Sequence, residues 1–180
     1  MKIQTLMNAR TRNWLIAATA GILVFGAAAM LQSSSTARAT PASGFNATDI
    51  TKSTFEKIRV LALGDAEGED AKVKIITKEP TDVYVVHNTV DMGGSSGWHS
   101  HPGPSVVLVK QGTATVYESD DPSCSPVTYP AGSGFIDAGG THVHMVANHG
   151  TQPLLLVAFQ IVPAGSPSRR IDAAKPSQCP

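Results

Sequence analysis

The chain has 180 residues, 42% of them hydrophobic, and its 14 basic residues equal its 14 acidic residues in number. This length suits a single domain with an additional segment at one end. The even charge balance leaves no strongly basic surface, which excludes a nucleic-acid-binding protein that relies on phosphate contacts.

The first 39 residues predict export from the cytoplasm. Three basic residues lie within the first 12 positions, an apolar run of 18 residues follows at 14–31, and Ala37-Arg38-Ala39 supplies a cleavage site. This order is typical of a secretory signal peptide. The run is also just long enough to act as an uncleaved membrane anchor. Both interpretations place the rest of the chain outside the cytoplasm, because the positive end of such a segment stays inside.

The part of the chain after residue 39 is acidic and contains both cysteines. Residues 1–39 hold four of the basic residues and no acidic residue, so the remainder has a net charge of −4. Its first segment, 40–53, is polar and rich in small residues, which predicts a linker. In an oxidising compartment we expect Cys124 and Cys179 to form a disulfide bond.

From Thr54 onward, short strand-like runs alternate with turn residues. The runs are rich in β-branched and aromatic residues, and glycines such as Gly112 and Gly150 separate them. No stretch after Leu31 keeps a helical period over three turns. Many short strands at roughly even spacing predict an all-β sandwich or barrel. The predicted strands cover residues 55–63, 73–76, 83–90, 106–110, 113–118, 126–129, 135–136, 142–146 and 154–162.

Four of the six histidines occur as two His-x-His pairs, His99 with His101 and His142 with His144. Residues i and i+2 of a strand face the same side, so each pair can present two imidazoles to one metal ion. A buried imidazole needs a partner for each ring nitrogen, and a barrel interior does not collect four of them without one. The two pairs therefore predict a metal site, and inert surface histidines are the alternative.

The first pair lies within a motif that resembles the cupin family, G-x5-H-x-H-x3,4-E-x6-G. Gly93, His99, His101 and Gly112 reproduce its spacing, and only Ser105 departs from it, standing where the family has glutamate. The resemblance covers roughly residues 72–163. It implies a double-stranded β-helix, or jelly-roll barrel, over residues 54–165, followed by a C-terminal tail at 166–180.

The second cupin motif is matched less closely. His144 and Asn148 reproduce its H-x3-N end, whereas Gly139 and His142 reproduce its G-x2-H part, and the motif proline is absent. The resemblance implies one divalent metal held by His99, His101 and a third histidine. We favour His144 as the third ligand, with His142 as the alternative, and we expect both to line the cavity.

Replacement of the glutamate by Ser105 changes what the resemblance implies about the metal. Three neutral imidazoles suit Fe, Zn, Cu or Ni, and they hold a harder cation such as Mn less well. One position on the metal stays open for a water molecule or a substrate. The alternative interpretation is that Ser105 marks a site that has lost its metal.

The resemblance leads to three functional hypotheses. The first is an exported metalloenzyme that acts on a small molecule, with His142 beside the ligands as a candidate acid–base group. The second is a non-catalytic protein that binds a small molecule or a metal, and the third is a structural jelly roll with a vestigial site. Cupins also form homodimers, so we include a second copy of the chain among the expected partners.

Overall fold

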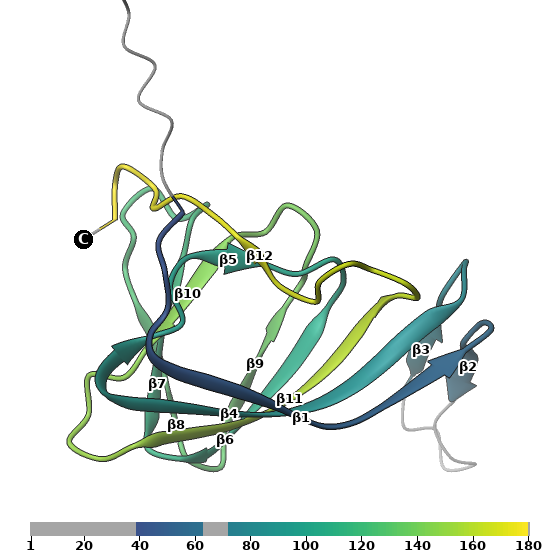
Figure 1. The fold of residues 1–180 in the computed structure, drawn as a ribbon, viewed down its shortest axis with the longest axis horizontal. Coiled ribbons are helices and arrows are strands. Elements are labelled where there is room, and N and C mark those ends of the chain that lie inside the picture. The colour runs from purple at the N-terminus through teal and green to yellow at the C-terminus, as the bar shows by residue number, and fades with distance from the viewer. Residues whose placement is uncertain (1–38, 63–71, 180) are drawn as a thin grey trace, which may run out of the picture. The chain divides into compact units, whose positions relative to one another are not determined.

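The computed structural model describes residues 39–62 and 72–179, and within these ranges the regular elements are all β-strands (Figure 1). The predicted all-β class is confirmed for this part of the chain. The strands are β1 (Ser43–Phe55), β2 (Arg59–Ala62), β3 (Val73–Ile76), β4 (Thr81–Ser95), β5 (His99–Ser100), β6 (Ser105–Gln111), β7 (Thr113–Glu118), β8 (Val127–Pro130), β9 (Gly134–Asp137), β10 (His144–Ala147), β11 (Leu154–Pro163) and β12 (Ile171–Asp172).

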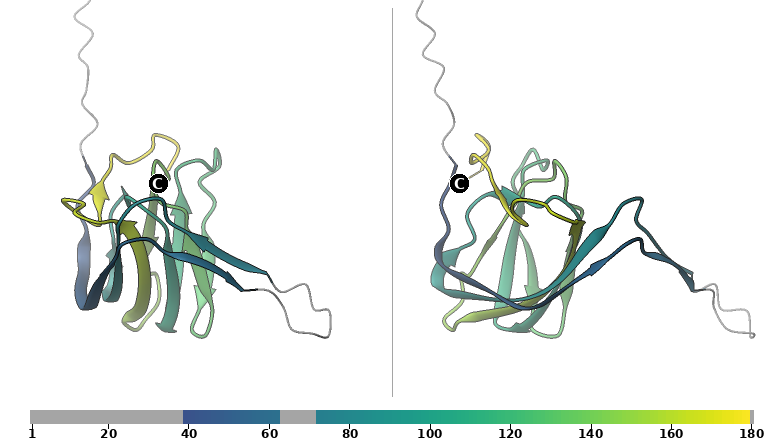
Figure 2. Two further views of the ribbon diagram at one scale, coloured as in Figure 1. Left: turned by 90° about the vertical axis from the view of Figure 1, so that its right-hand side faces the viewer. Right: turned by 45° about the vertical axis from the view of Figure 1, so that its right-hand side comes forward.

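Ten of these strands form one antiparallel sheet that curves into a nearly closed barrel (Figure 2). The main path of neighbours is β12-β5-β10-β4-β11-β6-β9, with β1 paired to β4 and β7 paired to both β10 and β8. Strands far apart in the sequence lie side by side, as β4 and β11 do along their whole overlap. The arrangement confirms the predicted jelly-roll fold.

The alternation of side chains along the strands builds the barrel interior. In β11 the residues Leu154, Leu156 and Ala158 are buried, whereas the residues between them are more exposed. The same period of two places Val107 and Val109 of β6 inside. Together with residues of β4, β7, β9 and β10 they form the main apolar core. The polar site described below lies next to this core, in the same interior.

The prediction of a linker at 40–53 is wrong, because most of this segment is strand β1. It pairs with β4 in an antiparallel register that runs from Ser43 opposite Ser95 to Phe55 opposite Thr81. Nearly all its residues are exposed, so the strand is stabilised by backbone hydrogen bonds to β4 more than by apolar burial. Its polar composition therefore gave no strand signal.

The predicted strand at 55–63 is divided in two. β1 ends at Phe55, and β2 begins at Arg59 and pairs with β3 in a separate two-stranded sheet. Residues 63–71 lie outside the described residues, as do residues 1–38 and therefore the apolar run at 14–31. Within the described ranges, no helix is long and apolar enough to cross a membrane.

The C-terminal segment is part of the barrel domain. Cys124 and Cys179 form the predicted disulfide bond, and strand β12 pairs with β5. The backbone N–H of Ala173 donates to the carbonyl of Trp98, and Trp98 is 1% exposed and packs beside the disulfide. The segment expected as a tail at 166–180 is thus attached to the barrel, and residues 164–179 are called the strap below. The strap is fixed to β5 by β12 and, at its C-terminal end, by the disulfide bond.

Candidate metal centre

Three histidines meet in the barrel interior. His99 lies in β5, His101 follows that strand directly, and His144 begins β10 and is the pairing partner of His99. The ring centroids are 4.9 Å apart for His99–His101, 4.4 Å for His99–His144 and 5.6 Å for His101–His144. All three side chains are buried. One nitrogen from each ring lies within 4.8 Å of the others, close enough to hold a metal ion.

Two close backbone approaches bring the loops of this site together. A Cβ at Gly139 would lie 2.3 Å from the carbonyl oxygen of Gly103, and Gly139 has a φ of 71°. Only glycine tolerates both the contact and the left-handed backbone. The backbone N–H of Gly140 then donates to the carbonyl of His101 at 2.7 Å. The loop before β10 is thereby held against the loop after β5.

Hydrogen bonds from the ring nitrogens orient two of the three imidazoles. His99 donates from Nδ1 to the carbonyl of Gly97 at 2.9 Å, and His101 donates from Nδ1 to the carbonyl of Arg169 at 2.6 Å. A carbonyl oxygen can only accept, so each Nδ1 carries the proton and each Nε2 keeps its lone pair. This is the tautomer that binds a metal through Nε2.

Burial keeps the three imidazoles neutral. Desolvation, assisted by the charge of Arg170, lowers the pKa of His99 to about 3. Desolvation and the neighbouring His99 lower the pKa of His144 to about 3, and burial also lowers the pKa of His101. Metal ligation needs the neutral form of histidine. At neutral pH the three rings are therefore ready to bind without releasing a proton.

Ser105, at the position of the cupin glutamate, is 1% exposed and lies opposite Asp137 of β9 in the antiparallel register. Asp137 is 2% exposed and faces the histidines. Its Oδ1 accepts the Gly139 N–H at 3.1 Å and the His142 Nδ1–H at 2.7 Å. Its Oδ2 lies 3.8 Å from Nε2 of His101. Asp137 thus places a buried carboxylate beside the imidazoles.

His142 does not line the cavity, and that prediction is wrong. Strand β10 starts only at His144, because Gly139 and Gly140 have φ values of 71° and 67° and form a turn before it. The His142 ring instead lies between Asp137 and Glu118, with Nε2 at 3.0 Å from a Glu118 oxygen. His142 belongs to two other sets of side chains that are close enough to hold a metal ion, Asp137–His142–His144 and Glu118–Asp120–His142. Its assignment as a metal ligand remains a prediction.

The environment of His142 differs electrostatically from that of the buried three. Partial burial acts to lower the pKa of His142, but the hydrogen bond to Asp137 and the charge of Glu118 outweigh it, and the pKa is raised. Burial raises the pKa of Glu118 to about 7. The surroundings therefore favour the charged form of His142, whereas burial disfavours the charged form of Glu118.

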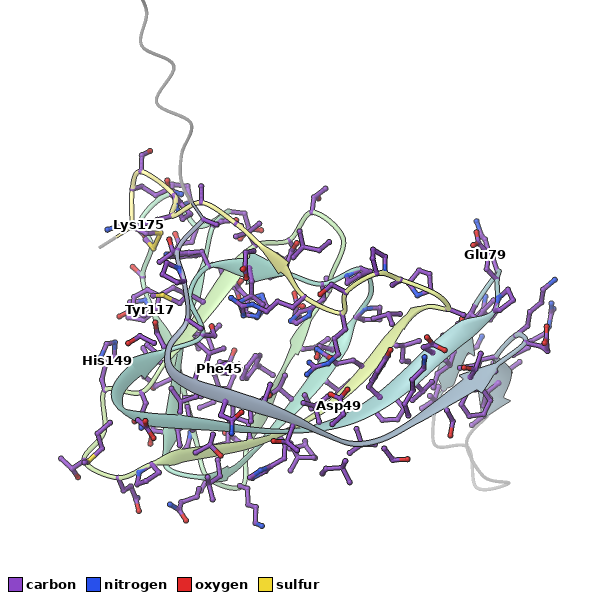
Figure 3. The ribbon with its side chains drawn as sticks, in the orientation of Figure 1. Phe45, Asp49, Glu79, Tyr117, His149 and Lys175 are labelled. Atoms are coloured by element: carbon purple, nitrogen blue, oxygen red, sulfur yellow. A yellow bond between two sulfur atoms is a disulfide. The ribbon has the colours of Figure 1, made fainter. Side chains whose placement is uncertain are left out.

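A cavity of about 200 Å³ opens over the histidines. Its walls combine apolar side chains, such as Val107 and Leu156, with the polar groups of Gln160 and Arg170. Phe45 of β1, labelled in Figure 3, is also part of the wall. Concave, mostly apolar spaces with a few convergent polar groups are typical of small-molecule sites.

The remaining histidines lie elsewhere. His149 is exposed and its Nε2 is 3.0 Å from the Tyr117 hydroxyl; both side chains are labelled in Figure 3. His87 is half-buried on β4, between β1 and β11, and is absent from the lining of the main cavity. Tyr84 contacts Lys52, whose Nζ lies 5.4 Å from the ring centroid.

Sequence reasoning missed the contributions of Asp137 and the strap. Asp137 follows Phe135 by two positions, so the period of the strand could have placed both inside. Arg169 and Arg170 lay in the expected tail and carried no motif. The predicted disulfide was the one signal that could have returned this segment to the barrel.

Comparisons with known proteins gave matches among solved structures alone. A scan against protein-family models found no match, and a search of curated proteins also found none. Among solved structures, the polyketide cyclase RemF from Streptomyces resistomycificus is 12% identical, with 78% of this chain and 79% of that chain covered and a TM-score of 0.49. An uncharacterized protein with a double-stranded β-helix domain from Klebsiella pneumoniae is 23% identical, with 67% and 81% covered and a TM-score of 0.41.

A third similar structure is a predicted oxalate decarboxylase from Thermotoga maritima. It is 19% identical, covers 47% of this chain and 83% of its own, and has a TM-score of 0.37. The named activities differ among these proteins, and all three superpose with TM-scores below 0.5. The activities are therefore not transferred to this chain, whose function has to be argued from its own site.

Proposed function

We propose that this chain is a cupin that binds one divalent metal through His99, His101 and His144 and acts on a small molecule in the cavity above them. The observation that carries the proposal is the convergence of three buried, neutral imidazoles, two of which have a fixed Nδ1–H tautomer. Buried imidazoles without a ligand would leave ring nitrogens unsatisfied, which is costly in a barrel interior.

The donor atoms present fit such an ion. Among the described residues, His144 Nδ1 and Asp137 Oδ2 are buried and have no hydrogen-bond partner. Two ligand atoms bound to one ion at about 2.0–2.2 Å each lie no more than about 4.4 Å apart. The separation of 3.8 Å between His101 Nε2 and Asp137 Oδ2 satisfies that limit. The set of imidazoles suits Fe²⁺, Zn²⁺, Cu²⁺ or Ni²⁺, and a carboxylate nearby makes Mn²⁺ a further candidate.

The surrounding residues orient the ligands and shape the cavity. The carbonyls of Gly97 and Arg169 hold the rings of His99 and His101, and apolar side chains such as Val107 and Leu156 line the space above them. A metal bound there would supply Lewis-acid or redox chemistry to a molecule in the cavity. His142, joined to Asp137 and Glu118, can hold a proton beside the site.

A non-catalytic metal or small-molecule carrier is the second candidate. It is favoured by the arginines of the strap, both of which are engaged in structural contacts: Arg169 pairs with Asp49 at 2.9 Å and Arg170 with Asp172 at 2.7 Å. These contacts leave few charged groups free in the cavity to take part in a reaction. A turnover assay with the metal-loaded chain separates the two candidates once a ligand is found.

The experiment that tests the metal site is a titration of the metal-free chain with Co²⁺, followed by visible absorption. We expect one equivalent to bind, with the d–d bands of a nitrogen-ligated ion, and we expect His101→Ala to abolish them. Addition of azide should then shift the bands if one position on the metal can exchange. A flat titration of the folded wild-type chain would refute the proposed site.

We further propose that the chain is exported. The support is the Cys124–Cys179 disulfide, a bond typical of an oxidising compartment. The barrel also incorporates the chain from Ala39 onward, since Ala39 bridges to Ala174 and the N–H of Thr40 donates to the carbonyl of Ala173. N-terminal sequencing of protein from the native host should give Thr40 as the first residue for a cleaved signal, and Met1 for a retained anchor.

A further inference from the structure

The cupin motif has a glutamate where this chain has Ser105. Another carboxylate, that of Asp137, lies beside Ser105 in the structure. Ser105 of β6 and Asp137 of β9 are directly opposite partners in an antiparallel pair. Opposite residues of such a pair have Cβ atoms about 4.5–5.5 Å apart and project from the same face of the sheet. The small Ser105 side chain therefore leaves room into which Asp137 can extend.

Asp137 extends into that room with one oxygen satisfied and one free. Oδ1 accepts two hydrogen bonds, from the Gly139 backbone and from His142. Oδ2 is buried and, among the described residues, receives no hydrogen bond. Oδ2 lies 3.8 Å from His101 Nε2, and Oδ1 lies 3.5 Å from His144 Nδ1.

A buried carboxylate oxygen of this kind needs a partner. The side chain is 2% exposed, and its ion pairs among the described residues involve only histidines. The hydrogen bond from His142 reaches Oδ1 and leaves Oδ2 without a donor. A metal ion bound between Oδ2 and the imidazoles would satisfy this oxygen.

We propose that Asp137, from strand β9, is the carboxylate ligand of the metal, in place of the glutamate that Ser105 replaces. The proposal rests on the three-histidine site proposed above and adds a fourth ligand to it. It makes the site one of three imidazoles and one carboxylate, with one more negative charge than three histidines provide. Such a site binds harder cations, Mn²⁺ and Fe²⁺, better than an imidazole-only site does.

In this arrangement His142 is a positioning residue. Its Nδ1–H fixes Oδ1 of Asp137 at 2.7 Å, and the Gly139 N–H holds the same oxygen from the backbone. The other oxygen is thereby aimed at the imidazoles. Glu118 holds the far side of the His142 ring at 3.0 Å. The second His-x-His pair therefore contributes one ligand directly and orients another.

The test is the affinity of the metal-free chain for Mn²⁺ and for Zn²⁺, measured by chelator competition in wild type and in Asp137→Asn. The substitution keeps the shape of the side chain and removes its charge. Loss of a residue that hydrogen-bonds to a metal ligand lowers metal affinity by about 10–100-fold. Because Asp137→Asn removes a ligand itself, we expect Mn²⁺ affinity to fall by more than this. We expect a smaller fall for Zn²⁺, because imidazoles alone suit it. Asp91→Asn is the matched control, since Asp91 is exposed on β4 and belongs neither to the cavity wall nor to a group of candidate metal donors.

A rescue variant separates ligation from positioning. In Ser105→Glu/Asp137→Asn the carboxylate returns at the position that the motif specifies. Recovery of Mn²⁺ affinity in this variant, with folding verified by thermal melting, supports a carboxylate ligand. Unchanged Mn²⁺ affinity in Asp137→Asn, or an equal fall for both metals, overturns the proposal while leaving the three-histidine site in place. Failure of the wild type to bind either metal refutes the site itself.

Discussion

The two His-x-His segments, 99–101 and 142–144, look alike in the sequence and differ in the structure. In the first, both rings are buried and turn their Nε2 atoms to the cavity, because carbonyls of Gly97 and Arg169 hold their Nδ1 atoms. In the second, only His144 is buried in the cavity wall, whereas the His142 ring lies between the carboxylates of Asp137 and Glu118. The spacing i, i+2 places two side chains on one face only when both residues lie in a strand, and a turn precedes His144.

The largest effect on metal binding is expected from alanine substitution of each histidine in the second segment. His144→Ala should abolish stoichiometric metal binding, since it removes a ligand. His142→Ala should weaken binding by about 10–100-fold, the cost of losing a partner of a ligand. Chelator competition with the metal-free variants measures both affinities. Equal loss in the two variants would show that the two histidines have the same role.

The strap offers a way to disturb the first segment alone. Cys124→Ser/Cys179→Ser removes a bond that closes a loop with a sequence separation of 55 residues. The chain-entropy relation gives a loss of about 4 kcal/mol in the free energy of unfolding. Denaturant unfolding, compared with Ser123→Ala as a control in the same loop, measures it. Because Arg169 of the strap orients His101, metal affinity should fall as well. A variant with wild-type stability would contradict the role of the strap.

The pH dependence of the metal-free chain should distinguish the buried histidines of the cavity from His142 by the sign of the effect. The pKa of His99 and of His144 is about 3, below the unfolded value of 6.5. Between these values the unfolded chain binds more protons than the folded chain, so acidification destabilises the fold, by roughly 1 kcal/mol per pH unit for each histidine. Denaturant unfolding at pH 7, 6 and 5 measures this loss, which should be smaller in His99→Gln. Stability that stays constant to pH 5 would contradict the burial of these rings.

His142 should titrate in the opposite direction. Its raised pKa means that the folded chain holds the proton more tightly, so this contribution to stability is complete below the unfolded pKa of 6.5 and is lost as the pH rises through the folded value. The imidazole C–H resonances in proton NMR, assigned by comparison with His142→Gln, follow the titration directly. A midpoint below 6.5 would contradict the contacts with Asp137 and Glu118.

The smallest effect on either segment is expected from changes on the outer face of the sheet. Val106, Leu108, Ile136 and Phe159 are exposed on the neighbouring strands β6, β9 and β11. We expect this apolar patch to bind a second copy of the chain. Ile136→Lys should convert a homodimer to a monomer in sizing with light scattering, with metal affinity unchanged. A wild-type chain that is already monomeric would contradict this prediction.

The sequence predicted the parts of the fold whose side chains alternate between core and solvent. β6 and β11 carry this alternation in apolar residues and were expected close to their observed bounds. β1 was missed because its contacts are mainly backbone hydrogen bonds to β4, which polar residues make equally well. The strap was missed because its attachment depends on a disulfide and on two-residue pairing with β5, neither of which leaves a local pattern.

Within the site, the histidines could be predicted from the sequence, but no carboxylate could be. His99 and His101 were recognised from a motif, and His144 from its spacing to Asn148. Asn148 is fully buried and donates to the carbonyls of Val90 and Gln152, so it fixes the turn after β10. Asp137 could not be assigned, because its proximity to Ser105 comes from the pairing of β6 with β9, a register that no spacing in the sequence specifies.

The most direct test of the central claim is elemental analysis of the mature chain, purified from its native compartment without an affinity tag, beside His99→Ala/His101→Ala. We expect close to one equivalent of a single transition metal in the wild type and almost none in the variant. The identity of that metal will also indicate the chemistry. A wild-type chain without metal, and unable to take up Mn²⁺, Fe²⁺, Ni²⁺, Cu²⁺ or Zn²⁺ on soaking, would contradict the account and identify the barrel as a binding or structural module.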